Sequence, residues 1–243
     1  MDNVIRLIID AEPRSGAWNM AADEVLLESA LTSESATVRI YRWEIATVSL
    51  GYFQDADDFR ASNRFRDLPA VRRLSGGGAI LHHHELTYSL ALSPGQPAAE
   101  NPTDVYRAVH DGIIRQLAAA GIEAGMRGTD ASLPDEPFLC FIRGDRHDIL
   151  CRDHKIVGSA QRRRRGAVLQ HGSLILQTSP YAEEIPGCLD LVPEARLPNK
   201  FDVLLGSQIA NCLGEPVQII DWTDEELGTI RDRKRQYLSI DRT

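Results

Sequence analysis

The sequence predicts an α+β fold in which a mixed β-sheet is flanked by helices. Segments with strand-like patterns dominate the middle of the chain, and helical patterns flank them. This arrangement favours a mixed sheet over a doubly wound parallel one. The chain shows no internal repeat, no low-complexity linker and no sharp change of composition. We therefore expect residues 1–243 to form one domain.

The first half of the chain is expected to hold one helix and five strands. After Gly16, apolar residues such as Trp18 and Val25 recur at helical spacing, which predicts a helix that runs to Ala30. The glycines at 76–78 separate the last two strands. The expected strands are Val4–Asp10, Thr37–Trp43, Thr47–Phe53 (interrupted by Gly51), Ala70–Leu74 and Ala79–Ser93.

The second half begins with the clearest helix, which starts at Asn101 and ends at Gly121, as helix start and stop signals predict. The polar stretch Arg127–Pro137 contains glycine and two prolines and is expected to be a loop. Turns are expected at Arg152–His154 and Arg162–Gly166. The remaining predicted elements are the strands His147–Cys151, Lys155–Ala160, Ala167–Leu176 and Pro216–Asp221 and the helices Phe201–Leu213 and Thr223–Leu238.

The charge and hydropathy patterns exclude two classes of function. With 27 basic and 35 acidic residues, the formal charge is −8, whereas a general nucleic-acid binder needs a large basic face. No stretch approaches the ~20 apolar residues that a membrane-spanning helix needs. The N-terminal residues have an early acid and a broken apolar run, so they do not form a signal peptide. We expect a cytoplasmic protein that binds neither nucleic acid nor membrane.

The segment Arg72–Ala79 is the first candidate for chemistry. Three consecutive glycines permit a turn or a close approach of the backbone to a ligand. With Arg72 and Arg73 just before them, exposed amides and guanidinium groups could hold an anion or a carbonyl oxygen. The segment is neither a Walker A loop nor a dinucleotide fingerprint. A flexible hairpin connection remains an equal alternative.

The run His82–Glu85 follows directly. Adjacent residues of a strand point to opposite faces, so at most His82 and His84 share a face. No HExxH pattern is present, and we expect no metal site. A structural or substrate-positioning role for one of these histidines is favoured.

Cysteine and lysine supply the remaining candidates. The four cysteines form no CxxC pair in a large chain without a signal peptide, so disulfides are not expected. Cys140 lies in an apolar segment that is typical of a buried, inert thiol. Lys155, one of three lysines, lies fifteen positions later, and a nearby cation would favour the thiolate. By spacing alone, a core cysteine is favoured, and the arginines at 162–165 are expected to be a solvated turn, with docking of an acidic partner as the alternative.

Four segments together match a known pattern. They are residues 16–27 (GAWNMAADEVLL), 39–54 (RIYRWEIATVSLGYFQ), 72–89 (RRLSGGGAILHHHELTYS) and 155–176 (KIVGSAQRRRRGAVLQHGSLIL). In this order they resemble the lipoate-attachment branch of the biotin/lipoate protein ligase superfamily. The resemblance implies a mixed sheet packed with helices around a hydrophobic tunnel for a lipoyl or octanoyl chain.

The resemblance also implies roles for individual residues. Lys155 corresponds to the catalytic lysine, and Cys140 occupies the position of the nucleophile in the octanoyltransferase class similar to the Gram-positive enzyme, upstream of the lysine. In this chain His83 follows His82 where the family commonly has aspartate. The implied substrate-binding residues are Arg72, Arg73, Gly76, Gly77, Gly78 and His82 on one wall of the tunnel and Gly158, Ser159, Ala160, His171 and Gly172 on the other.

The resemblance therefore implies an octanoyltransferase. Such an enzyme takes an octanoyl group from octanoyl-acyl carrier protein onto Cys140 and passes it to a lysine of a lipoyl domain, in a 2-oxoacid dehydrogenase subunit or the glycine cleavage H protein. It needs no metal, ATP or other cofactor. Since the chain ends soon after the predicted helix Thr223–Leu238, we expect it to lack the C-terminal accessory domain that single-chain lipoate ligases usually carry. The alternatives are an ATP-dependent ligase catalytic unit, an amidotransferase between lipoyl domains and a non-catalytic acyl-binding relative.

Overall fold

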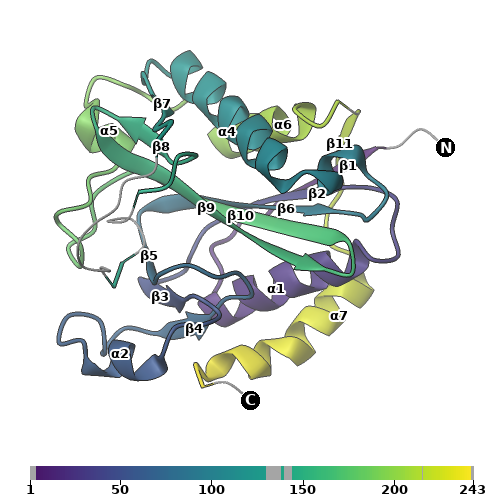
Figure 1. Cartoon of the computed structure of the whole chain (residues 1–243), viewed down its shortest axis with the longest axis horizontal. Coiled ribbons are helices and arrows are strands. Elements are labelled where there is room, and N and C mark those ends of the chain that lie inside the picture. The colour runs from purple at the N-terminus through teal and green to yellow at the C-terminus, as the bar shows by residue number, and fades with distance from the viewer. Residues whose placement is uncertain (1–3, 130–137, 140–143, 215, 242–243) are drawn as a thin grey trace.

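The computed structural model describes residues 4–129, 138–139, 144–214 and 216–241. Its centre is an eight-stranded mixed sheet with the strand order β11-β1-β2-β6-β10-β9-β8-β7. Helices cover both faces of this sheet, with α4 and α6 on one face and α1 and α7 on the other (Figure 1). The predicted α+β fold with a mixed sheet flanked by helices is confirmed.

Parallel and antiparallel pairs occupy different parts of the large sheet. The first strand is parallel to both of its neighbours, the second and the last strand in the chain, whereas the other pairs are antiparallel. The strands are β1 (Ile5–Ile9), β2 (Thr37–Tyr41), β6 (Glu85–Leu92), β7 (Gly125–Met126), β8 (Ile149–Cys151), β9 (His154–Arg164), β10 (Ala167–Ile175) and β11 (Val217–Ile219).

A second, three-stranded sheet lies on the side of the large sheet that faces α1 (Figure 1). It has the order β4-β3-β5, with β3 (Thr47–Leu50) parallel to β4 (Ala70–Arg72) and antiparallel to β5 (Ile80–His82). The helices of the chain are α1 (Gly16–Ser29), α2 (Ala56–Ala61), α3 (Pro97–Glu100), α4 (Pro102–Ala119), α5 (Cys188–Leu191), α6 (Phe201–Asn211) and α7 (Asp224–Arg233), and the 3₁₀ helix η2 (Lys234–Leu238) follows α7.

The central strand β6 shows how the sequence builds one dry face and one polar face. All of its eight residues are buried. The largest hydrophobic cluster contains four residues of β6, together with buried apolar residues of α4 and α6. The four residues are Leu86, Tyr88, Leu90 and Leu92. Because strand side chains alternate, the other residues point toward α1 and the small sheet, and three of them are polar: Glu85, Thr87 and Ser89. A buried polar surface therefore lies on that side of the sheet.

The largest differences from the sequence prediction lie at two connections and in four short elements. The expected single strand Ala79–Ser93 is two strands, because the chain turns at His83 and His84 and passes from the small sheet into the large one. The expected turn Arg162–Gly166 is shorter: β9 runs to Arg164, and Arg165 and Gly166 make the turn with φ of 50° and 87°. Such a pair of positive φ values suits a tight hairpin between antiparallel strands. The short elements α2, α3, α5 and β7 were not predicted.

The last predicted helix is confirmed in part. Thr223 caps α7 through a capping box with Glu226, and the α-helix then ends at Arg233, where the backbone tightens into η2.

In the part of the chain that the structure describes, none of the helices combines the length and apolar character needed to cross a membrane.

Candidate functional site

The candidate site lies on the face of the large sheet that looks toward α1 and the small sheet, called the site face below. In β9 and β10, Gly158 pairs with Ser173 and Ala160 pairs with His171, so these four residues share one face. His171 contacts α1 through Asp23, and Ser173 contacts Glu85 at the start of β6. On the site face, the quoted segments 155–176 and 72–89 therefore meet α1. Residues Arg72–Ala79 of the second of these segments are called the glycine segment below.

Lys155 enters this face as one half of a buried ion pair. Its Nζ lies 2.9 Å from Oδ1 of Asp148, and both side chains are almost fully buried. Burial raises the pKa of Asp148 above its ordinary value, and the Lys155 charge only partly offsets that rise. Oδ2 of Asp148 also accepts a 2.7 Å hydrogen bond from the backbone N–H of Asp145. The ammonium group is thus held in place before any substrate binds.

Gly158 is required for this placement of Lys155. A Cβ atom at Gly158 would lie 2.7 Å from Cε and 3.0 Å from Nζ of Lys155. Distances this short cannot be tolerated without moving the lysine side chain. The glycine of the KIVGSA segment therefore makes room for the lysine four-carbon stem.

The two arginines before the glycine run hold the loop by its backbone. The Arg73 guanidinium is buried and donates to the carbonyl oxygens of Ser49, Gly76 and Gly78, at 2.6–2.8 Å. Arg72 donates to the carbonyl oxygens of Gly51, Tyr52, Gln54 and Ile240. Their predicted role in binding substrate stays a prediction, and the contacts in the structure are those of groups that shape the loop.

Gly77 is the tightest point of this loop. Its φ is 92°, a conformation that favours glycine, and its carbonyl oxygen would lie 1.9 Å from a Cβ atom at Gly51. The two glycines therefore allow the loop to lie directly against the end of β3. The hairpin alternative is wrong, because β4 and β5 do not pair with each other but flank β3.

His82 is buried at the end of β5 and is held on three sides. Its Nδ1 lies 2.7 Å from Oε1 of Glu85, its Nε2 lies 2.7 Å from Oγ of Ser49, and its ring stacks on Trp43 with centroids 3.8 Å apart. Glu85 also accepts hydrogen bonds from Thr87 and Ser173. The acid that partners His82 is thus Glu85, three residues later, while His83 points elsewhere and contacts Ser179.

His171 makes a second contact of the same kind. Its Nδ1 lies 3.0 Å from Oδ2 of Asp23 in α1, and its Nε2 lies 2.5 Å from Oγ of Ser75 in the glycine segment. Burial raises the pKa of Asp23, but hydrogen bonding and charge from His171, together with the charge of Arg39, bring the net pKa below its ordinary value. The Asp23–His171–Ser75 chain therefore ties the glycine segment to α1 and β10.

Ser159 and Gly172 are also in the predicted set, but they face the other way. Their register places them on the face covered by α4, and Ser159 Oγ lies 2.7 Å from both the Tyr88 hydroxyl and His110 Nε2. A Cβ atom at Gly172 would lie 2.2 Å from Ser159 Oγ. Strand alternation therefore divides the predicted set: the Ser159 side chain packs under α4, while Gly158, Ala160 and His171 lie on the site face. The substrate-binding role of these residues stays a prediction.

Cys140, the predicted nucleophile, lies outside the described residues. Its neighbour Leu139 is described: it forms a parallel bridge with Ala79, and Ala79 N–H donates to the carbonyl oxygen of Phe138 at 3.0 Å. The other cysteines are poor nucleophiles, since burial raises the pKa of Cys151 and Cys212 and raises that of Cys188 to about 12.

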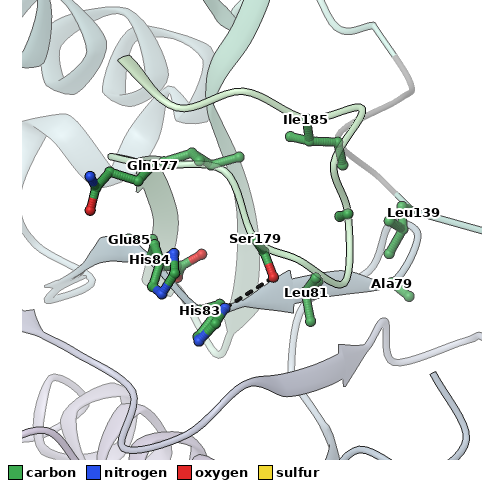
Figure 2. Close-up of a pocket in the computed structure, with 11 residues that line it drawn as sticks. Ala79, Leu81, His83, His84, Glu85, Leu139, Gln177, Ser179 and Ile185 are labelled. Atoms are coloured by element: carbon green, nitrogen blue, oxygen red, sulfur yellow. Dashed lines mark hydrogen bonds between the residues drawn. The ribbon is translucent and has the colours of Figure 1, made fainter. Parts of the chain in front are cut away.

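A narrow apolar pocket lies on the other side of β5 from His82. Its volume of about 20 Å³ is room for a single water molecule. Figure 2 shows Leu81, Leu139 and Ile185 around it, with His83 hydrogen-bonded to Ser179 at one side. Neither Lys155 nor His171 lines it. Among the residues that the structure describes, no group of three His, Cys, Asp or Glu side chains has the geometry to hold a metal ion.

Comparison with known proteins identifies the family. Residues 15–212 match the lipoyl protein ligase A/B catalytic domain. The chain belongs to this family. Two octanoyltransferases LipM are similar to it: that of Kyrpidia tusciae is 37% identical over 180 residues, and that of Anoxybacillus flavithermus is 35% identical over 248 residues. The first match covers 69% of this chain and 65% of the relative's length, and the second covers 98% and 85%.

Solved structures of the family share the fold. Lipoate-protein ligase A bound with ATP superposes with a TM-score of 0.74 and 22% identity, covering 99% of this chain and 97% of that one. A bipartite lipoate protein ligase from Thermoplasma acidophilum gives a TM-score of 0.73 and 19% identity, covering 100% and 98%. The expected biotin/lipoate ligase type of catalytic-domain fold is therefore confirmed.

Several residues of the site were not found from the sequence. Asp148 lies outside the quoted segments and Asp23 lies inside the first of them, and only the tertiary fold brings them to Lys155 and His171. Glu85 and Ser75 lie inside the quoted segments but carry no spacing signal of their own. A buried carboxylate beside a histidine or lysine becomes visible only when the partner is known.

We predict that Asp23→Asn lowers the free energy of unfolding at pH 7 by about 3 kcal/mol, because the substitution leaves the buried Arg39 with one counter-charge fewer. The pKa of Asp23 is lowered in the folded state, so its stabilising effect is present above the ordinary pKa of 3.8 and is lost as the pH falls below it. Urea unfolding of both proteins between pH 7 and 3 should show the difference narrowing below about pH 4. If the difference in the free energy of unfolding between the two proteins stays constant from pH 7 to 3, the lowered pKa of Asp23 in the folded state is wrong.

Proposed function

We propose that this chain is an octanoyltransferase that acts through a thioester on Cys140. In this proposal, residues 1–243 work as one catalytic domain in the cytoplasm. The donor is octanoyl-acyl carrier protein, and the acceptor is a lysine of a lipoyl domain, in a 2-oxoacid dehydrogenase subunit or the glycine cleavage H protein. No metal, ATP or other cofactor takes part in the reaction.

The observation that carries the proposal is the buried Lys155–Asp148 pair on the site face. A lysine held in a closed site can stabilise a thiolate and can also exchange a proton, which arginine cannot do. Gly158 and Asp148 fix the position of its ammonium group. Of the described cysteines, none has a lowered pKa, so they do not compete for the role of nucleophile.

The path of the chain before Cys140 also supports the proposal. Leu139 pairs with Ala79 at the end of the glycine segment, and successive Cα atoms are about 3.8 Å apart. The last described residue before Cys140 therefore lies beside the end of the glycine segment. Gly77 N–H has no partner among the described residues and is a candidate donor to the oxyanion that forms on the acyl carbon.

The reaction then has two balanced steps. In the first, the Cys140 thiolate attacks the octanoyl carbonyl, the C–S bond to the carrier protein breaks, and the carrier thiolate leaves and takes up a proton. In the second, the amine of the acceptor lysine forms the amide bond, and Cys140 leaves as a thiolate. The amine proton passes to the Lys155–Asp148 pair and from there to solvent, which balances the proton that the carrier thiolate takes up in the first step.

The comparisons support the same reaction. The relatives of highest identity among those described above are octanoyltransferases, and one match covers 98% of this chain. The T. acidophilum ligase was studied with its E2 lipoyl domain, which supports a lipoyl domain as the acceptor. The alternatives are an ATP-dependent ligase unit and an amidotransferase between lipoyl domains, and both are outcomes of the tests below.

We predict that incubation with octanoyl-acyl carrier protein adds one octanoyl group to this chain and that hydroxylamine removes it. Cys140→Ala should abolish the adduct, because the substitution removes the sulfur atom to which the octanoyl group is attached. Cys151→Ala, Cys188→Ala and Cys212→Ala are matched controls and should keep it. Intact-mass spectrometry measures the outcome.

An adduct that survives in Cys140→Ala would exclude the assignment. If the chain instead modifies a lipoyl domain only with free octanoate and ATP, the ligase alternative is correct. If it takes an octanoyl group from an octanoyl-lipoyl domain faster than from the carrier protein, it is the amidotransferase.

We also predict that Gly158→Ala slows both the acylation of Cys140 and the transfer step by about 10- to 100-fold, because the new Cβ displaces Lys155 and small errors of position have effects of this size. Gly95→Ala is the matched control, since a Cβ atom at Gly95 meets no neighbour within 4 Å. Rapid-quench measurements of each step, with the melting temperature of each variant, check the result. Unchanged rates in Gly158→Ala would show that the position of Lys155 is not important.

A further inference from the structure

A line of hydrogen-bonded polar side chains crosses the large sheet on the face covered by α4, opposite the site face. It consists of Gln161 in β9, Gln170 in β10, Tyr88 in β6, Ser159 in β9 and His110 in α4, and each neighbouring pair is 2.7 Å apart. The two steps of the proposed reaction use none of these side chains. Gln170, Tyr88 and His110 are buried, and buried polar groups need partners, so the continuous chain has to be explained.

The direction of each hydrogen bond follows from His110. Its Nδ1 lies 2.5 Å from the backbone carbonyl oxygen of His147, and a carbonyl can only accept, so Nδ1 carries the proton. Burial lowers the pKa of His110 to about 4, so the ring is neutral at pH 7 and Nε2 is an acceptor. The Ser159 hydroxyl must therefore donate to Nε2.

The remaining bonds run in the same direction. Since Ser159 gives its only proton to His110, the Tyr88 hydroxyl donates to Ser159 Oγ. Gln170 Nε2 donates to the Tyr88 hydroxyl, and Gln161 Nε2 donates to Gln170 Oε1. All five hydrogen bonds point toward the His147 carbonyl, and bonds aligned in this way polarise and strengthen one another.

The last bond acts on the residue that holds the lysine. The His147 carbonyl belongs to the planar peptide that joins His147 to Asp148, so fixing it fixes the direction in which the chain enters Asp148. The His147 ring is also stacked on Tyr106, one turn before His110 in α4, with centroids 5.2 Å apart. Asp148 Oδ1 then lies 2.9 Å from Lys155 Nζ. The chain of bonds thus connects the packing under α4 to the ammonium group on the other face.

We propose that His110 is a positioning residue for Lys155: its Nδ1–H fixes the His147–Asp148 peptide and, through Asp148, the place of the ammonium group. The inference rests on the proposed function for the role of Lys155 in acyl transfer. It assigns to His110 a task that neither the motifs nor the site-face geometry contains.

Three substitutions of His110 distinguish the hydrogen-bond donor at Nδ1 from the rest of the ring. His110→Asn places an amide N–H near the position of Nδ1 and keeps the bond to the His147 carbonyl. His110→Gln reaches instead toward the position of Nε2, and His110→Ala removes both. His84→Ala is the matched control, because His84 Nδ1 also lies 3.0 Å from a backbone carbonyl, that of Thr178, but away from Lys155.

The first measurement is the steady-state rate of octanoyl transfer, below the melting temperature of every variant. His110→Ala and His110→Gln should lower kcat about 10- to 100-fold with the KM for the carrier protein unchanged. His110→Asn should stay within about threefold of the unaltered protein, which is the rescue that a purely structural role would not give. His84→Ala should have no effect on kcat.

The second measurement does not depend on activity. The chain has three lysines, so a protein labelled with ¹³C-lysine gives few side-chain signals, and Lys155→Arg identifies that of Lys155. The Cε signal of Lys155 should move in His110→Ala and His110→Gln and stay in place in His110→Asn. If the unaltered protein takes up no octanoyl group, the proposed function fails, and this signal alone then decides the role of His110.

Two results would overturn the inference. The first is an unchanged Lys155 signal in folded His110→Ala, whether or not kcat falls, and the second is an equal change in His110→Asn and His110→Ala. If His110→Ala does not fold, His110→Gln carries the test, and an unchanged Lys155 signal in His110→Gln overturns the inference.

Discussion

The pairing of charges buried between the large sheet and α1 is the constraint on which the site depends. Arg39 and Arg73 are almost completely buried, and so are Asp23 and Glu85. An unpaired charge in such a place costs several kcal/mol, so each group has to find a partner. Arg39 pairs with Asp10 and Asp23, and Arg73 is surrounded by carbonyl and hydroxyl oxygens. The glycine segment takes its shape because its carbonyls are among those partners.

The alternation of side chains along β9 and β10 gives one motif two tasks. Gly158 and His171 serve the site face, whereas Ser159 and Gly172 pack under α4. A short strand motif is therefore not a list of residues that touch substrate. Ser159 and Gly172 contribute to the packing of the sheet that holds Gly158 and His171. In the role proposed for His110, this packing also acts on the chemistry, through the backbone at Asp148.

The sequence predicts the regular part of the fold well because its periodicity is strong. The strand Ala167–Leu176 and the helix that ends near Gly121 lie within a residue or two of β10 and α4. The corner at His83 and His84 was not predictable, since a strand pattern runs through it and only the two separate sheets reveal the break. For the site, Lys155 and His171 follow from the motif, but Asp148 does not, because the residue that neutralises a buried lysine is chosen by the tertiary fold.

The central claim is that a thioester on this chain is an intermediate in the transfer of the acyl group, and a single-turnover chase tests it most directly. The octanoylated protein is separated from carrier protein and mixed with a lipoyl domain in the absence of ATP. The account predicts that the thioester disappears at the same rate as the octanoyl-lysine appears, and that this rate is at least as fast as steady-state turnover. A thioester that persists while the lipoyl domain stays unmodified would contradict the account.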